Sequence, residues 1–196
     1  MREVELKSVV DDPAAAVAAL RAAGARLVLE GRLSDTRYDT ADRALLASDH
    51  VLRLRVFHGI SETRATIDWK GPTGFEAGYK VREELSSEIG DEQTLARILA
   101  GLGYVVIREI DRHIMQFELG GATIRFEHYP RMDVLVEIEG EPAAIEAAIA
   151  AAGLPRAGCT TERLLDFVTR FEARTGQRAA LCEQELTGEF RYAFNA

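Results

Sequence analysis

The chain has 196 residues, 47% of them hydrophobic and 29% charged, which excludes a disordered protein and suits one compact domain with a single core. Its 24 Lys and Arg against 32 Asp and Glu give a formal net charge of −8, which argues against nucleic acid or an anionic membrane as the main partner. The absence of a long apolar run, of an apolar leader and of paired cysteine spacing (only Cys159 and Cys182 occur) predicts a cytoplasmic protein without membrane spans, zinc or disulfides.

The predicted elements begin with a strand at Val4–Val10 and a helix that starts at Asp11-Asp12-Pro13, runs to Ala23 and is capped at Gly24. Short strands separated by turn signals follow at Ala25–Gly31, Ser34–Tyr38, Val51–Phe57, Thr63–Lys70, Tyr79–Ile89, Val105–Phe117, Thr123–Tyr129 and Val134–Glu139. Further helices are predicted at Asp91–Ala100, Pro142–Ala152 and Thr161–Arg174, and the segment from Gln177 onward is assigned to no element. Most gaps between strands are too short for crossover helices, so we expect an antiparallel α+β protein.

Charged side chains recur at every second position of the predicted strands. Arg53 and Arg55 share one face of their strand, while Leu52 and Leu54 occupy the other. The same alternation joins Asp68 with Lys70, Arg82 with Glu84 and Glu88, Arg108 with Arg112, Arg125 with Glu127, and Glu137 with Glu139. A sheet with one solvated face is the commonest cause of alternation. These faces are almost purely charged, with acids on some strands and arginines on others, which favours a closed barrel with charges inside and helices on its apolar exterior.

Acidic and basic side chains packed together inside a barrel need ligands to be stable. Carboxylates bind Mg²⁺ or Mn²⁺ through hard oxygen atoms, whereas Arg and Lys bind phosphate oxygens. The pattern therefore indicates a site for a polyanion together with a divalent metal.

The segment Glu3-Val4-Glu5-Leu6-Lys7 resembles the N-terminal ExExK signature of the CYTH superfamily, the triphosphate tunnel metalloenzymes. Other family motifs follow in order, namely DxYFDTxD at Asp35 to Asp42, LRxR at Leu52 to Arg55, TxKGP at Asp68 to Pro72, RxE at Arg82 to Glu84, KxR at Arg108 to Arg112 and FVEIEG at Leu135 to Gly140. The resemblance covers roughly residues 1–175 and leaves 176–196 as an extension of unknown role. It implies a closed eight-stranded antiparallel tunnel that binds a triphosphate.

The resemblance also implies roles for individual residues. The carboxylates expected to hold Mg²⁺ or Mn²⁺ are Glu3, Glu5, Glu84, Glu127, Glu137 and Glu139. The side chains expected to bind phosphate are Lys7, Arg53, Arg55, Lys70, Arg82, Arg108 and Arg112. The expected catalytic set is Glu5, Lys7, Glu137 and Glu139.

Five positions depart from the family pattern. Ser86 stands where a second acid is usual and Ile110 where a Lys is usual, while Arg37, Asp68 and Glu127 replace Tyr, Thr and Asp. These changes predict an altered balance of charge in the middle of the tunnel.

Three functions remain open at this point. The first is metal-dependent hydrolysis of inorganic triphosphate or of a nucleoside or thiamine triphosphate. The second is a class IV adenylyl cyclase, in which the 3′-hydroxyl of ATP attacks the α-phosphate, and the third is a triphosphate-binding module without catalysis. The altered KxR strand favours hydrolysis. We expect a small-molecule triphosphate as the partner, bound by a monomer or a homodimer.

Overall fold

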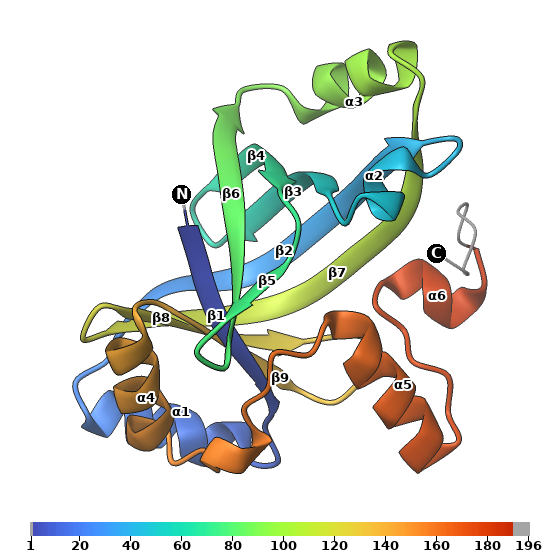
Figure 1. Ribbon diagram of the computed structural model, residues 1–196. Coiled ribbons are helices and arrows are strands. Elements are labelled where there is room, and N and C mark those ends of the chain that lie inside the picture. Colours follow the sequence, from blue (N-terminus) through green and yellow to red (C-terminus); the bar gives the residue numbers. More distant parts are fainter. Residues whose placement is uncertain (1, 190–196) are drawn as a thin grey trace.

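The computed structural model describes residues 2–189, so Phe190, Tyr192 and Phe194 of the unassigned segment lie outside the described residues (Figure 1). The strands are β1 (Arg2–Val9), β2 (Arg26–Thr40), β3 (Val51–Gly59), β4 (Thr63–Lys70), β5 (Gly74–Glu76), β6 (Tyr79–Ile89), β7 (Tyr104–Leu119), β8 (Ala122–His128) and β9 (Leu135–Glu139). The helices are α1 (Pro13–Ala22), α2 (Ala44–Ala47), α3 (Glu92–Gly101), α4 (Pro142–Ala151), α5 (Leu164–Thr175) and α6 (Glu183–Thr187), with a 3₁₀ turn at Arg156–Gly158. None of the helices in residues 2–189 combines the length and the apolar composition that crossing a membrane requires.

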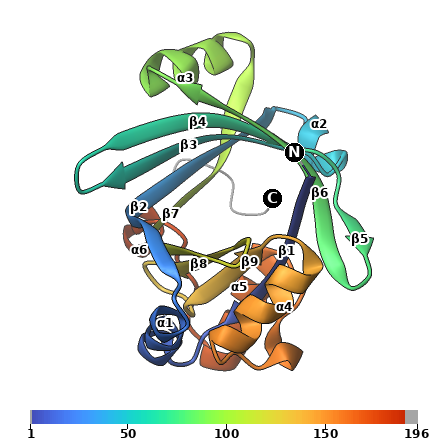
Figure 2. The ribbon, with the colours of Figure 1, turned by 90° about the vertical axis from the view of Figure 1, so that its left-hand side faces the viewer.

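Eight strands close into an antiparallel barrel in the order β1-β9-β8-β7-β2-β3-β4-β6, because β6 pairs back with β1. Figure 2 shows this ring of strands, with α1 and α4 on one side of it and α3 on the other. The short strand β5 is an addition that pairs with β6. The predicted α+β class and the closed eight-stranded antiparallel barrel are confirmed. In the ring, three strands separate β1 from β2 in either direction, so β1 and β2 form opposite walls.

The apolar faces of the strands point outward, where helices cover them. Leu6 of β1 and Ile138 of β9 are buried in one cluster with Ile145 of α4. On another side of the barrel, Leu54 of β3 is buried against Leu99 of α3. Because successive side chains of a strand point to opposite faces, burying these residues outside turns their charged neighbours into the barrel.

The helix boundaries follow ordinary capping chemistry. The Asp12 carboxylate caps α1 as predicted, and the Asp91 carboxylate accepts hydrogen bonds from backbone N–H groups at the start of α3. Helix α5 begins at Leu164, later than predicted, because the Asp166 carboxylate accepts the backbone N–H of Arg163 at 2.8 Å and fixes the start there.

Strand β2 is longer than the sequence suggested. The two strands predicted at Ala25–Gly31 and Ser34–Tyr38 form one continuous strand. A Cβ atom at Gly31 would lie 2.2 Å from the carbonyl oxygen of His58 on β3. Gly31 therefore permits a close approach of two strands and does not mark a strand end.

Part of the predicted extension packs on the rest of the chain. Residues 179–182 are buried, and the Leu181 carbonyl accepts a 2.7 Å hydrogen bond from the backbone N–H of Asp111 on β7. Ala180 forms an antiparallel bridge with Arg131. The predicted boundary of the tunnel domain at residue 175 stays a prediction.

Candidate functional site: a charged cavity inside the barrel

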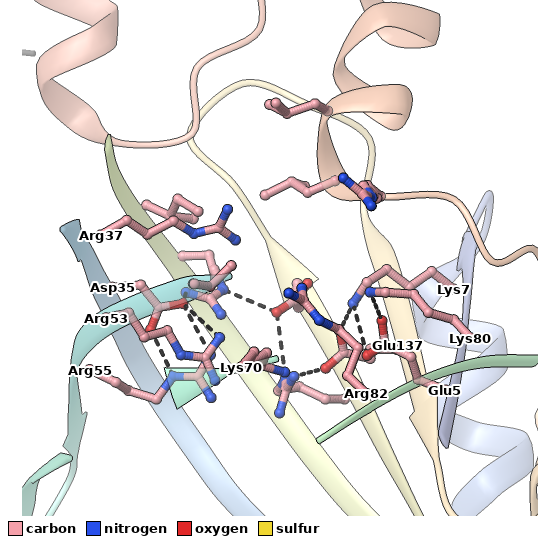
Figure 3. A pocket seen from close by; sticks show the side chains of 18 of the residues that line it. Glu5, Lys7, Asp35, Arg37, Arg53, Arg55, Lys70, Lys80, Arg82 and Glu137 are labelled. Carbon is pink, nitrogen blue, oxygen red and sulfur yellow. Dashed lines mark hydrogen bonds and ion pairs between the residues drawn. The ribbon is translucent and has the colours of Figure 1, made fainter. Parts of the chain in front are cut away.

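A cavity of about 170 Å³ lies inside the barrel (Figure 3). The cavity is lined by ten Lys and Arg side chains and by only five Asp and Glu side chains. The whole chain, in contrast, carries a net charge of −8. Leu46 of α2 and Leu164 and Leu165 of α5 also line the cavity. The charged strand faces thus enclose a cation-rich interior within an acidic protein, and such an interior attracts anions.

Most of the predicted site residues meet in this cavity. Those that line it are Glu5, Lys7, Arg53, Arg55, Lys70, Arg82, Arg112, Glu127 and Glu137. Glu3, Glu84, Glu139 and Arg108 are not among the lining residues. Figure 3 shows Asp35, Arg37, Arg53 and Arg55 on one side of the cavity and Glu5, Lys7, Lys80 and Glu137 on the other.

The wall built on β1 owes its contacts to strand register. Glu5 lies opposite Lys80 of β6 and Glu139 of β9, and Lys7 lies opposite Glu137 of β9. Lys80 donates a hydrogen bond to Glu5, and Lys7 forms an ion pair with Glu137. Burial lowers the pKa of Lys7 to about 8, against the opposing pull of the Glu5 carboxylate. Burial would raise the pKa of Glu5, but the ammonium groups of Lys7 and Lys80 hold that pKa well below its usual range.

The opposite wall is organised around Asp35 of β2. Arg55 donates two hydrogen bonds to its carboxylate at 2.7 and 3.0 Å, and Arg112 Nη1 lies 3.0 Å from the same group. Arg112 Nε also donates to Glu127 at 3.0 Å. Burial alone would raise the pKa of Asp35, but the guanidinium groups of Arg112, Arg55 and Arg53 hold it well below its usual range. The wall therefore presents arginines that are charged and fixed in place.

Two of the departures from the family pattern lie side by side. Asp68 of β4 and Ser86 of β6 are directly opposite in the register, and the Ser86 hydroxyl donates a 2.6 Å hydrogen bond to Asp68. Asp68 in turn accepts a 2.7 Å hydrogen bond from Arg53 Nε. A carboxylate therefore lies directly beside Ser86, on the neighbouring strand. The predicted change in the balance of charge stays a prediction.

Three carboxylates converge near β1. One oxygen from each of Glu3, Glu5 and Glu139 lies within 4.8 Å of the others. All the donors are carboxylate oxygens, the ligands that Mg²⁺ and Mn²⁺ prefer. Burial and repulsion from Glu5 and Glu139 raise the pKa of Glu3, and the attraction of Lys70 does not outweigh them. The all-oxygen donor set fits a divalent cation, which would compete with Lys70 for Glu3 and with Lys80 for Glu5.

The other predicted metal ligands contact cationic side chains. Glu84 accepts a 3.0 Å hydrogen bond from Arg53, and Glu127 accepts one from Arg112 at 3.0 Å. Glu137 forms ion pairs with a lysine and an arginine. Within residues 2–189 these three carboxylates stand outside the Glu3–Glu5–Glu139 cluster. Their assignment as metal ligands stays a prediction.

Several lining side chains were given no role from the sequence, namely Asp35, Arg37, Asp49, Lys80, Arg125, Tyr129 and Arg163. Lys80 and Arg125 share strand faces with Arg82 and Glu127, so alternation alone could have placed them. Asp49 and Arg163 lie outside the strands, and Arg163 Nη2 is 3.0 Å from the Asp49 carboxylate. Only the tertiary fold brings these two residues to the cavity.

Several solved structures share this fold. An adenylate cyclase candidate from Vibrio parahaemolyticus superposes with a TM-score of 0.71 at 21% identity, covering 85% of this chain and 97% of that one. The PH1819 protein of Pyrococcus horikoshii gives a TM-score of 0.72 at 20% identity, covering 86% and 98%. An adenylyl cyclase candidate from Hippeastrum, described with a dominant triphosphatase activity, gives 0.63 at 15% identity, covering 91% and 98%.

Sequence comparison identifies the family of this chain, which similarity of fold alone does not. No curated protein matches the chain. The family model of the CYTH domain matches residues 1–151, which include every strand of the barrel and both walls of the cavity. This protein therefore belongs to the CYTH domain family.

Proposed function

We propose that this protein is a Mg²⁺- or Mn²⁺-dependent triphosphatase that hydrolyses inorganic triphosphate or an organic triphosphate inside the barrel. The observation that carries the proposal is the pairing of two opposite walls. One wall gathers the carboxylates of Glu3, Glu5 and Glu139, and the other presents Arg55 and Arg112 as fixed cations. A short polyphosphate that crosses the cavity would meet these arginines on one side and, on the other, Glu5, the member of the carboxylate cluster that lines the cavity.

The cationic side chains would hold the phosphate chain. Arg53, Arg55 and Arg112 offer guanidinium groups that match phosphate oxygens, and Lys7 and Lys70 offer point charges. Asp68 already fixes Arg53 by a hydrogen bond, and Asp35 fixes Arg55 in the same way. Little conformational freedom of these side chains therefore remains to be lost when the substrate binds. Positioning and charge stabilisation are the main contributions that a protein makes to phosphoryl transfer.

Arg82 has a bracing role in this arrangement. Its Nε donates to the Gly71 carbonyl at 2.6 Å and its Nη2 donates to the Asp49 carbonyl at 2.6 Å. Arg82 thus ties β6 to two loops at the edge of the cavity, which fixes the position of lining residues such as Asp49.

Glu3, Glu5 and Glu139 would hold the divalent cation. When bound, it supplies charge neutralisation of the phosphates and a lowered pKa for a coordinated water. In the reaction, a water oxygen forms a bond to the terminal phosphorus, the bridging P–O bond breaks, and the proton of the water passes to solvent or product. The products from inorganic triphosphate are orthophosphate and pyrophosphate.

Two considerations support hydrolysis over cyclisation. A cyclase has to orient an adenosine so that its 3′-hydroxyl reaches the α-phosphate, whereas 15 of the lining side chains are charged and suit the phosphate chain itself. The Hippeastrum protein, which shares the fold, is described with a dominant triphosphatase activity.

The test is a product analysis. Purified protein is incubated with inorganic triphosphate, ATP or thiamine triphosphate, each with Mg²⁺, Mn²⁺ or EDTA, and the products are separated by ion-exchange chromatography. Orthophosphate that forms only with metal supports the proposal. Cyclic AMP with pyrophosphate would replace it by the cyclase activity, and no product from any substrate would leave a binding module.

A further inference from the structure

Arg37 is the middle residue of a row of three arginines on the neighbouring strands β3, β2 and β7. On β2 it lies directly opposite Arg53 of β3 and directly opposite Arg108 of β7. Side chains in such positions are close neighbours, and like charges there repel each other. A row of this kind persists only where acids or a ligand balance the charges.

The arginines of this row differ in how many acidic partners they have. Arg53 donates hydrogen bonds to Asp68 and Glu84 at 2.7 and 3.0 Å. Arg37 makes no ion pair within 4.0 Å among residues 2–189, and its buried Nε has no hydrogen-bond partner there. The nearest acid on its own strand face, Asp35, is already bound by Arg55 and Arg112. Burial and the neighbouring arginines lower the pKa of Arg37 to about 10, which reflects the same lack of compensation.

Arg37 lines the cavity, and Figure 3 shows it on the side away from Glu5 and Lys7. Arg37 is half-buried and its Nε is shielded from solvent, so its unpaired charge is unfavourable until an anion arrives. The planar guanidinium group matches the oxygens of a phosphoryl group better than it matches any neutral partner.

We propose that Arg37 binds a phosphoryl oxygen of the substrate at the wall opposite the Glu3–Glu5–Glu139 cluster and thereby determines affinity for condensed phosphates. The proposal rests on the proposed function only in taking a triphosphate as the ligand. It assigns this role to a position where the family pattern has Tyr, so it is a property of this chain.

The proposal has a signature that a structural role would lack. In the ligand-free protein Arg37 adds repulsion without a compensating contact, so Arg37→Met keeps or raises the midpoint of thermal unfolding. In the presence of the anion, the same variant loses affinity. Arg37→Lys keeps the charge but loses the planar fork, so we expect its affinity to lie between those of the wild type and Arg37→Met.

The test measures binding of inorganic triphosphate in EDTA by isothermal titration calorimetry, with thermal unfolding of each ligand-free protein followed in parallel. Arg26→Met is the matched control, because Arg26 lies on the same strand but is exposed. We expect Arg37→Met to bind at least tenfold more weakly than the wild type, with an undiminished unfolding midpoint, and Arg26→Met to bind as the wild type does. In turnover assays the loss should fall on KM more than on kcat.

Wild-type affinity in Arg37→Met would overturn the role of Arg37 and leave the proposed function standing. A ligand-free Arg37→Met protein that unfolds at a lower temperature and binds weakly would show a structural residue, which also overturns it. Failure of the wild-type protein to bind triphosphate, with and without Mn²⁺, would overturn the proposed function as well.

Discussion

Lys70 on β4 donates hydrogen bonds to both carboxylate oxygens of Glu3 on β1, at 2.6 and 2.7 Å. Its ammonium group therefore binds the carboxylate of Glu3, which is one of the three members of the Glu3–Glu5–Glu139 cluster. Lys70 Nζ also lies 3.1 Å from Glu84. One predicted phosphate contact thus pairs with two predicted metal ligands, and its charge competes with any cation that the cluster binds.

Removal of this competing charge should strengthen metal binding. We expect Lys70→Met to bind Mn²⁺ about tenfold more tightly than the wild type in the absence of substrate, because a charge-assisted hydrogen bond worth about 1.5 kcal/mol no longer has to be broken. The same variant should bind triphosphate more weakly. Calorimetric titration with Mn²⁺ and, separately, with triphosphate in EDTA measures both effects. Weaker Mn²⁺ binding in Lys70→Met would show that the lysine supports the metal site.

Glu5 lies at the centre of the β1 wall, so its charge is central to the proposed reaction. Glu5→Gln keeps the shape of the side chain but removes the charge that the cation and Lys80 both need. We expect turnover to fall by at least about 100-fold, since that is the upper range for residues that merely support a metal ligand. Phosphate release measures the effect, and circular dichroism checks the fold. Glu118→Gln, an exposed glutamate on β7, is the control. Full activity in Glu5→Gln would contradict the assignment.

Asp35 makes stability depend on pH. Its pKa in the folded protein lies well below the value of about 3.9 expected in the unfolded chain. The unfolded state therefore binds more protons at acid pH, so the contribution is complete above about pH 5 and is lost as pH falls through the range below 4. Urea unfolding between pH 3 and pH 7 should show this slope in the wild type.

The slope should become shallower in Asp35→Asn. At pH 7 this variant should be less stable by about 3 kcal/mol, because Arg55 and Arg112 lose a buried partner. Asp11→Asn changes an exposed residue and should keep both the stability and the slope of the wild type. An unchanged pH dependence in Asp35→Asn would assign the acid sensitivity to other carboxylates.

Gly31 should tolerate no side chain. The Cβ atom of an alanine would lie 2.2 Å from the His58 carbonyl oxygen, so β2 and β3 would have to separate. We expect Gly31→Ala to lower the free energy of unfolding by about 3 kcal/mol, near the upper end for overpacking. Gly101→Ala, at the end of α3 with no atom within 4 Å of the added methyl, should be neutral or slightly stabilising. Equal stability of the two variants in urea unfolding would contradict this explanation.

The fold could be predicted because its patterns are local. Alternation places Arg53 and Arg55 on one face of a strand and Leu54 on the other, and this predicts which face enters the barrel. Gly31 misled the prediction because a glycine that permits close approach looks the same in the sequence as one that ends a strand. Helix α2 gave no local signal, since its start is held by the Asp39 carboxylate, which accepts the N–H groups of Leu45 and Leu46 from several residues away.

The site was predictable to a different degree on each wall. Glu5 and Lys7 carry a spacing that can be read from the sequence, but their partners Lys80 and Glu137 depend on strand register. Arg37 could be read as a departure from the family pattern. Its lack of a counter-charge became visible only when β3 and β7 were placed on either side of it.

The position of β1 between β6 and β9 has a consequence for synthesis of the chain. Residues 2–9 leave the ribosome before the other strands of the barrel, yet they gain their second neighbouring strand only when residues 135–139 have been made. Until then Glu3 and Glu5 have no partner at Glu139, and the cavity has no closed wall on that side. Such long-range pairing makes folding slow and late. A nascent chain that stops before β9 therefore contains every arginine of the opposite wall but no working site.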